Sequence, residues 1–130
     1  DAINLVKTQG VKLVPVYNIP NDEIPTYLNA ADVLILTSKY EGSVNVVKEA
    51  MACDTPIVST DVGDVKKNIS GLMNCHLSES SSKQLAQKID AVLSASNRSN
   101  GREQIFKKDL DSASVARKLI KTYEEQLCRE

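Results

Sequence analysis

The chain has 130 residues, enough for one domain with a sizeable core, and 42% of them are hydrophobic. Its net charge is −1 and its 16 Lys and Arg residues are scattered, which excludes the basic surface of a nucleic-acid-binding protein. Three cysteines without close pairs argue against a disulfide framework and a zinc site. No apolar run could span a membrane and no signal-peptide pattern opens the sequence, so we expect a cytoplasmic globular protein.

Three elements are expected before the centre of the chain. Residues 1–9 carry a helical pattern that Gly10 would close in the left-handed cap conformation. Residues 11–16 alternate and end in apolar residues, which predicts a strand near whose end Pro15 removes a ladder donor. A short helix is expected to follow, with Asn21 as its cap. Its predicted buried residues are Ile24, Tyr27 and Leu28.

The rest of the chain is organised around residues 32–61. The apolar runs 32–38 and 55–60 have the length and β-branched content of strands that are buried on both faces. Gly42 and Ser43 stand where a helix between these strands would begin. The apolar residues of that helix are Val46, Val47, Ala50 and Met51. The unit is a parallel crossover, which brings the free N–H groups of the helix to the carboxyl end of the first strand and creates an anion site.

Two carboxylates are close to this anion site in the sequence, Glu41 in the turn and Glu49 inside the helix. Because acids repel a phosphate, these side chains are better suited to accept hydrogen bonds from hydroxyl groups. A diphosphate flanked by hydroxyls describes a nucleotide sugar. The alternative is that Glu41 only favours the helix dipole and that Glu49 is a solvated surface acid.

A second loop, residues 61–64, is expected at the same edge as Glu41 because it also follows a strand of the crossover. Gly63 in this loop would let a ligand approach the backbone, or would serve only as a turn residue. The sequence leaves both interpretations open.

The second half of the chain predicts a helical turn at 65–69, an edge strand at 72–77 and three helices. The caps expected for the first and last of these helices are Ser81 or Ser82 and Asp111 or Ser112. The middle helix is expected around Phe106. The apolar residues of the first are Leu85, Ala86, Ile89, Val92 and Leu93, and those of the last are Val115, Leu119, Ile120, Tyr123 and Leu127. Four strands alternating with helices predict a three-layer α/β domain with a mainly parallel sheet.

Several motifs in this order resemble the nucleotide-sugar-binding half of family 4 (group 1) glycosyltransferases, and most of all bacterial enzymes that build polysaccharides. The runs that carry the resemblance are Ile24–Val33, Ser38–Ser43, Val47–Cys53 and Pro56–Gly63. The resemblance implies the Rossmann-like, C-terminal, donor-binding half of a two-domain GT-B enzyme, in truncated form. The first two strands, a basic pair and the acceptor-binding N-terminal domain would then be absent from these 130 residues.

The resemblance also implies a reaction. It is transfer of a sugar from a nucleotide-sugar donor to a glycan or lipid-linked acceptor with retention of configuration, without a metal or cofactor. Membrane contact, if any, would be peripheral and would use the absent domain. The fragment alone is expected to be inactive, because donor closure needs both domains. Strand 11–16 is expected to move beside residues 33–36, or the open edges to be covered by other parts of the protein or another chain.

Roles for individual residues follow from the resemblance. Glu41 would face the transferred sugar as the catalytic residue, and Glu49 would accept hydrogen bonds from the ribose hydroxyls. The remaining donor-binding residues would be Gly42, Ser43, Val44 and Asn45 at the diphosphate, and Tyr17 and Asn18 at the base. Two rivals remain open on the sequence: a non-catalytic α/β module that binds a nucleotide or a protein, and a nucleotide-sugar epimerase of the same architecture.

Overall fold

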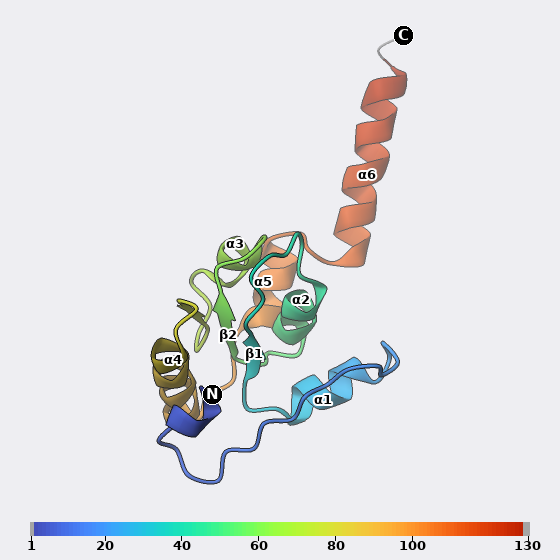
Figure 1. Cartoon of the computed structure of the whole chain (residues 1–130). Helices are drawn as coiled ribbons and strands as arrows, with labels where there is room; N and C mark the ends of the chain where they lie inside the picture. The colour runs from blue at the N-terminus through green and yellow to red at the C-terminus, as the bar shows by residue number, and fades with distance from the viewer. Residues whose placement is uncertain (1, 129–130) are drawn as a thin grey trace.

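The computed structural model describes residues 2–128 and shows an α/β domain around a small parallel sheet (Figure 1). Its strands β1 (Leu34–Leu36), β2 (Ile57–Thr60) and β3 (His76–Ser78) are hydrogen-bonded in the order β1-β2-β3. The register places Leu36 of β1 beside Ser59 of β2. The helices are η1, a short 3-10 helix (Ile3–Leu5), α1 (Ile24–Ala30), α2 (Asn45–Ala52), α3 (Val65–Ile69), α4 (Ser82–Ala95), α5 (Gly101–Lys107) and α6 (Ser112–Leu127).

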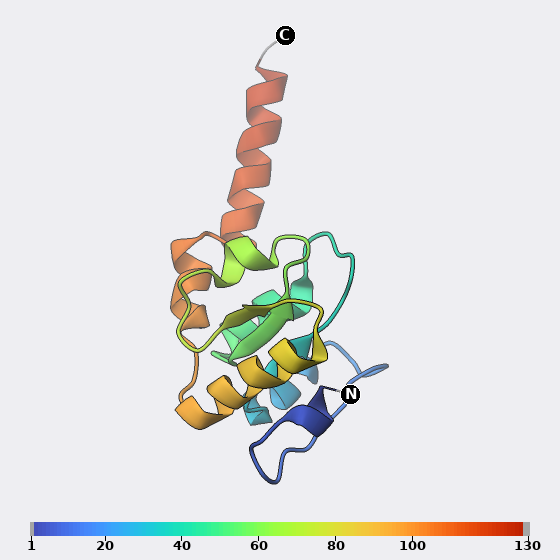
Figure 2. The same cartoon turned by 60° about the vertical axis from the view of Figure 1, so that its left-hand side comes forward.

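Helices cover both faces of the sheet, which confirms the predicted three layers (Figure 2). Ile57 of β2 packs into the larger core cluster with α2, α3 and α5, whereas its neighbour Val58 packs with Ile89 and Val92 of α4 on the opposite face. All four residues of β2 are buried. This is the double burial that the continuous apolar run predicted, since alternate side chains of a strand point to opposite faces.

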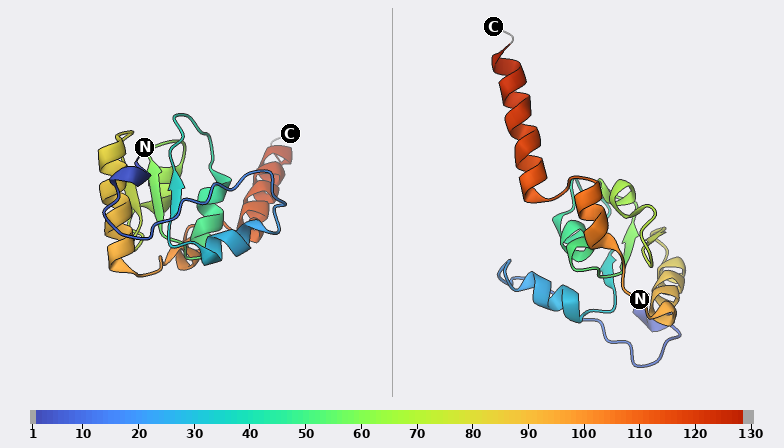
Figure 3. Two further views of the ribbon diagram at one scale, coloured as in Figure 1. Left: turned by 60° about the horizontal axis from the view of Figure 1, so that its bottom comes forward. Right: turned by 180° about the vertical axis from the view of Figure 1, so that it is seen from behind.

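The predicted strand at residues 11–16 is wrong. This segment has no regular structure, and Leu13 and Val14 are 57% and 54% exposed. A strand exists through the hydrogen bonds that it exchanges with a neighbour, and the three-stranded sheet of the described residues does not include this segment. The expected shift of residues 11–16 to the side of β1 is therefore also wrong. The views from below and behind show this segment as an irregular connection toward α1 (Figure 3).

Two local predictions are corrected as well, and the helix expected around Phe106 forms as α5. The helical pattern at residues 1–9 forms only the short helix η1, and residue 1 lies outside the described part of the chain. Gly10 has a positive φ, as predicted, with a value of +75°. In α1, Leu28 is buried but Tyr27 is 40% exposed. In α5 it is Ile105 that enters the core, and Phe106 is 63% exposed. A helix of only two turns fixes its inward face through its neighbours, which the local sequence does not show.

The last helix forms where the sequence predicts it, and Asp111 caps it by accepting a hydrogen bond of 2.9 Å from the Ser114 N–H. However, α6 projects away from the rest of the domain (Figure 1). Its apolar residues Val115, Leu119, Ile120, Tyr123 and Leu127 are 42% to 75% exposed.

Candidate functional site

The carboxyl ends of β1 and β2 lie side by side, as a parallel pair requires. The Thr60 hydroxyl at the end of β2 donates a hydrogen bond of 2.7 Å to the Ser38 carbonyl just after β1. The loops that follow, residues 37–44 and 61–64, therefore leave the same edge of the sheet. This arrangement confirms that the second loop lies at the edge that carries Glu41.

Gly63 brings the two loops into contact. A Cβ at this position would lie 1.9 Å from the Gly42 carbonyl oxygen, and the φ of +52° is one that side chains disfavour. The neighbouring Asp64 N–H donates a hydrogen bond of 3.1 Å to the same Gly42 oxygen. Gly63 is thus required both for a turn conformation and for the close approach of two backbone segments of this chain.

The Asp64 carboxylate lies at the start of α2. Its Oδ1 accepts a hydrogen bond of 3.1 Å from the Val44 N–H, and its Oδ2 accepts one of 2.8 Å from the Ser43 hydroxyl. Lys48 Nζ is 3.2 Å from Oδ2 and also contacts the Ser43 hydroxyl. Val44 is the N-cap residue of α2 and has no side-chain acceptor of its own. Asp64 therefore supplies from another loop the carboxylate that a helix N-terminus favours.

These contacts set the ionisation of the site. Burial raises the pKa of Asp64, but the contacts from Val44, Ser43 and Lys48 outweigh it and lower the pKa from its ordinary value of 3.8 to about 2. The side chains of Lys48 and Asp64 are only 25% and 29% exposed. Near neutral pH the two groups form a charged pair whose net charge is zero.

The two predicted acids are placed differently from Asp64. Glu41 lies in the exposed loop after β1, and Glu49 lies on the exposed side of α2, away from the buried residues Val47 and Ala50. Within residues 2–128, neither carboxylate has an ion-pair partner at 4 Å or less or a hydrogen-bond donor from the protein. Both are available to accept hydrogen bonds from a ligand, although Glu49 faces solvent rather than a cleft.

The other predicted donor-binding residues fall into two groups. Gly42, Ser43 and Asn45 are exposed around the start of α2, close to Glu41 in the chain, whereas Val44 is buried. Tyr17 and Asn18 lie in the irregular segment before α1, with Tyr17 74% exposed and Asn18 at a φ of +54°. Across residues 2–128, no hydrogen bond connects this second group with the loop that carries Glu41.

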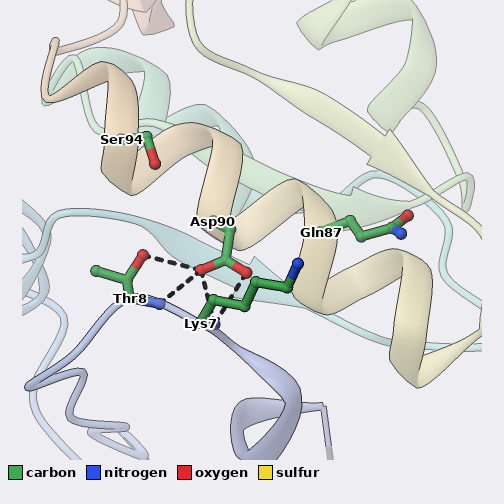
Figure 4. Close-up of a pocket in the computed structure, with 5 residues that line it drawn as sticks. All are labelled: Lys7, Thr8, Gln87, Asp90 and Ser94. Carbon is green, nitrogen blue, oxygen red and sulfur yellow. Dashed lines mark hydrogen bonds between the residues drawn. The ribbon is translucent and has the colours of Figure 1, made fainter.

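A surface depression of about 390 Å³ lies elsewhere, between α4 and the segment after η1 (Figure 4). Its Asp90 accepts hydrogen bonds from the Lys7 and Thr8 N–H groups at 2.9 to 3.0 Å and from the Thr8 hydroxyl at 2.8 Å. These bonds, first of all that from Lys7, hold the pKa of Asp90 below its ordinary value. Because its carboxylate is already bonded, Asp90 ties the N-terminal segment to α4 and offers little to a ligand.

A comparison with protein families identifies the family of the segment that contains the two strand-end loops. The model of the family described as "Glycosyl transferases group 1" matches residues 3–95, which include both loops and Glu41, Glu49 and Asp64. The chain belongs to this family. A protein of Bacillus subtilis (strain 168), provisionally named as a teichuronic acid biosynthesis glycosyltransferase, TuaC, is 47% identical over 47 residues. That match covers 36% of this chain and 12% of TuaC. No solved structure matches the chain.

Two residues of the site in this group 1 glycosyltransferase chain, Asp64 and Lys48, were not identified from the sequence. In the sequence they lie only within the loop 61–64 and the predicted helix, and the contact between them depends on how the two loops meet. The available signal was an acid directly after Gly63 at the carboxyl edge of the sheet. An acid beside a predicted helix start is a candidate for capping that helix.

Further features of the group 1 chain bear on metal and membrane binding. In the part of the chain that the structure describes, no three His, Cys, Asp or Glu residues are grouped so that they could hold a metal ion. None of the helices within residues 2–128 combines the length and apolar character needed to cross a bilayer.

Proposed function

We propose that this chain is the donor-binding domain of a retaining glycosyltransferase, which transfers a sugar from a nucleotide sugar to an acceptor in bacterial polysaccharide biosynthesis. The observation that carries the proposal is the pair of unpartnered carboxylates, Glu41 and Glu49, on either side of the start of α2, within the segment that matches the family. The printed name of TuaC supports the link to polysaccharides.

The chemistry of the edge suits a donor with hydroxyls on both sides of a diphosphate. Glu49 accepts hydrogen bonds from the ribose hydroxyls, and Glu41 faces the transferred sugar. The free N–H groups at the start of α2, beginning with Ser43 and Asn45, approach the diphosphate. The Val44 N–H already donates to Asp64 Oδ1, so it could bind the diphosphate only as a donor shared between two acceptors.

The charges at this edge argue that another part of the protein completes the site. Lys48 is paired with Asp64, and Lys66 is 3.7 Å from Asp61, so both cations are neutralised within the described structure. Exposed Lys39, in the same loop as Glu41, offsets one of the two free carboxylates, so Glu41, Glu49 and Lys39 leave the edge with a net charge of −1. A leaving diphosphate needs positive charge. In our proposal a facing domain of a GT-B enzyme provides that charge and encloses the donor.

The remaining parts of the proposal concern the whole protein. It acts in the cytoplasm, takes a glycan or a lipid-linked acceptor, needs no metal or cofactor and binds no nucleic acid. Tyr17 and Asn18 contribute to the base site. Any contact with a membrane is peripheral and belongs to the domain that binds the acceptor.

A nuclear magnetic resonance titration tests the proposal on the chain itself. UDP- and GDP-sugars are added up to millimolar concentration to ¹⁵N-labelled protein, since a donor that uses this edge must change the environment of its backbone N–H groups. We expect the amide signals of residues 42–45 and 61–64 to move with at least one donor. If no donor moves them, the proposed function is wrong.

A transfer assay separates the proposal from its rivals. The chain is incubated with the same donors and with glycan and lipid-linked acceptors. We expect the donor to remain intact, because the positive charge and the enclosure are lacking. Conversion of the donor into its epimer would favour an epimerase, and full turnover by this chain would remove the need for a facing domain.

A further inference from the structure

We propose that Asp64 is the positioning residue of the donor site: it holds the loop Glu41–Asn45 in the conformation that receives the donor. The inference rests on the proposed function and extends it to a residue that need not touch the ligand. The role follows from three observations: the use of both carboxylate oxygens, the anchoring of Asp64 itself, and the exposure of the loop residues that precede Val44.

Both oxygens of Asp64 are bonded to one short stretch of chain. Oδ1 accepts the Val44 N–H at 3.1 Å and Oδ2 accepts the Ser43 hydroxyl at 2.8 Å. A further bond runs in the opposite sense, from the Asp64 N–H to the Gly42 carbonyl at 3.1 Å. Three consecutive residues of the loop are thus fixed to one residue, and hydrogen bonds to a charged acceptor are stronger than neutral ones.

Asp64 can fix the loop because it is itself held in place. It is the residue before α3, and its carbonyl accepts the Asn68 N–H at 3.0 Å. Val65 is completely buried and Ile69 is 3% exposed, so α3 is packed firmly into the larger core cluster. The loop is therefore braced against the core through Asp64.

The residues before Val44 have few other contacts, although Val44 itself is buried in the larger core cluster and Gly63 touches the Gly42 carbonyl. Gly42 has no atom within 4 Å of the position where a Cβ would be, and Glu41 and Ser43 are exposed. Outside the Asp64 contacts, the Ser43 hydroxyl meets Lys48 Nζ, and the bond from the Thr60 hydroxyl to the Ser38 carbonyl lies several residues earlier in the chain. Without the Asp64 carboxylate, the segment around Ser43 and the Val44 N–H would have to be ordered further when the donor binds, and that ordering lowers affinity.

Lys48 makes this arrangement compatible with an anionic ligand. A free carboxylate at the start of α2 would repel the donor's diphosphate. Lys48, a residue of α2, places its Nζ 3.2 Å from Asp64 Oδ2 and neutralises the carboxylate. The pair therefore fixes the loop and adds no net charge to the site.

The test compares Asp64→Ala with Glu125→Ala, which also removes one carboxylate. Glu125 is 3.8 Å from exposed Lys121 on α6, the helix that projects away from the domain, so its removal leaves the loop Glu41–Asn45 untouched. The dissociation constant is measured for the UDP- or GDP-sugar that shifts the wild-type signals. We expect about tenfold weaker binding for Asp64→Ala and no change for Glu125→Ala. Asp64→Asn, which keeps an acceptor for Val44, should fall between wild type and Asp64→Ala.

Amide hydrogen exchange without ligand measures the protection of the Val44 N–H that is bonded to Asp64. This measurement uses the wild type and does not need Asp64→Ala to fold. In the wild type, the Val44 N–H should exchange at least about tenfold more slowly than the Gly42 N–H. Equal exchange at these two amides would overturn the proposal.

The binding measurements distinguish the positioning role from the proposed function. Donor binding by a folded Asp64→Ala variant with wild-type affinity would overturn the positioning role and leave the proposed function intact. A wild-type chain that binds no donor would overturn both.

Discussion

Asp54 Oδ1 accepts a hydrogen bond of 2.8 Å from the backbone N–H of Arg102, at the first turn of α5. Asp54 lies two residues after the end of α2 at a φ of +53°, and its carbonyl accepts the Ser99 N–H at 2.8 Å. One residue therefore ends the turn after α2 and fixes the segment that leads into α5. These two helices cover the same face of the sheet, so the contact holds one layer of the domain together.

The first prediction follows from this contact. Asp54→Ala removes the acceptor at the start of α5 and places alanine at a positive φ, so we expect it to lower the free energy of unfolding by about 1 to 3 kcal/mol. Asp54→Asn keeps both an acceptor and tolerance of this backbone conformation and should stay within about 0.5 kcal/mol of wild type. Urea denaturation measures both variants. A small effect of Asp54→Ala would mean that α5 is held by other contacts.

The second prediction concerns the spacing of α2 and α5. A Cβ at Gly101 would lie 2.6 Å from Met51 Cα, which belongs to the backbone of α2 and cannot move alone. We expect Gly101→Ala to destabilise the domain by about 1 to 3 kcal/mol, because the two helices must separate. Gly42→Ala is the matched control, since open space surrounds that position, and should change stability by less than about 0.5 kcal/mol. Equal thermal stability of the two variants would contradict the close helix contact.

The third prediction is a dependence of stability on pH. The pKa of Asp64 is lowered in the folded protein to about 2, so the carboxylate stabilises the fold above its ordinary pKa of 3.8. That contribution should be lost as the pH falls from about 4 to 2. The shift corresponds to about 2 kcal/mol, which solvent at a partly exposed carboxylate reduces to about 1 kcal/mol. Denaturation of wild type and Asp64→Asn should therefore differ above pH 4 and converge toward pH 2. Parallel curves over this range would assign the stabilisation to other groups.

The fourth prediction distinguishes the two free acids in donor binding. If Glu49 takes both ribose hydroxyls, Glu49→Gln should weaken binding of the nucleotide sugar by about 1.5 to 3 kcal/mol, or roughly tenfold to a hundredfold. Glu41→Ala should leave affinity for the nucleoside diphosphate near wild type, because that molecule lacks the sugar that we propose Glu41 to face. Calorimetry on both variants tests the assignment. A large loss of diphosphate affinity in Glu41→Ala would mean that the roles are exchanged or shared.

The elements that the sequence predicted correctly carry their signal within their own residues. The double burial of β2 follows from its continuous apolar run, and the inward face of α4, with Ile89 and Val92, follows from its helical spacing. Residues 11–16 show why pattern is not sufficient, because a strand needs a partner with free backbone groups beside it. Tyr27 shows the same limit for the short helix α1, whose inward side is set by the neighbouring α2 and not by its own composition.

The candidate site divides in the same way. Glu41 and Glu49 stand out in the sequence because they flank a predicted helix start and match the acids of the family motif, and their roles stay a prediction. The Asp64–Lys48 pair could not be found in this manner, because its geometry depends on how two loops meet. That meeting requires Gly63 to pass next to Gly42, a contact between backbones that neither loop encodes separately.

The projection of α6 gives the molecule a long axis. With 16 residues, the helix adds about 24 Å in one direction, and it is capped at its base by Asp111. An elongated body rotates more slowly end over end than about its own axis, so amide vectors along α6 should relax differently from those of the sheet. The ratio of nuclear spin relaxation rates in α6 and in β2 would therefore report the angle between this helix and the principal axis of rotation.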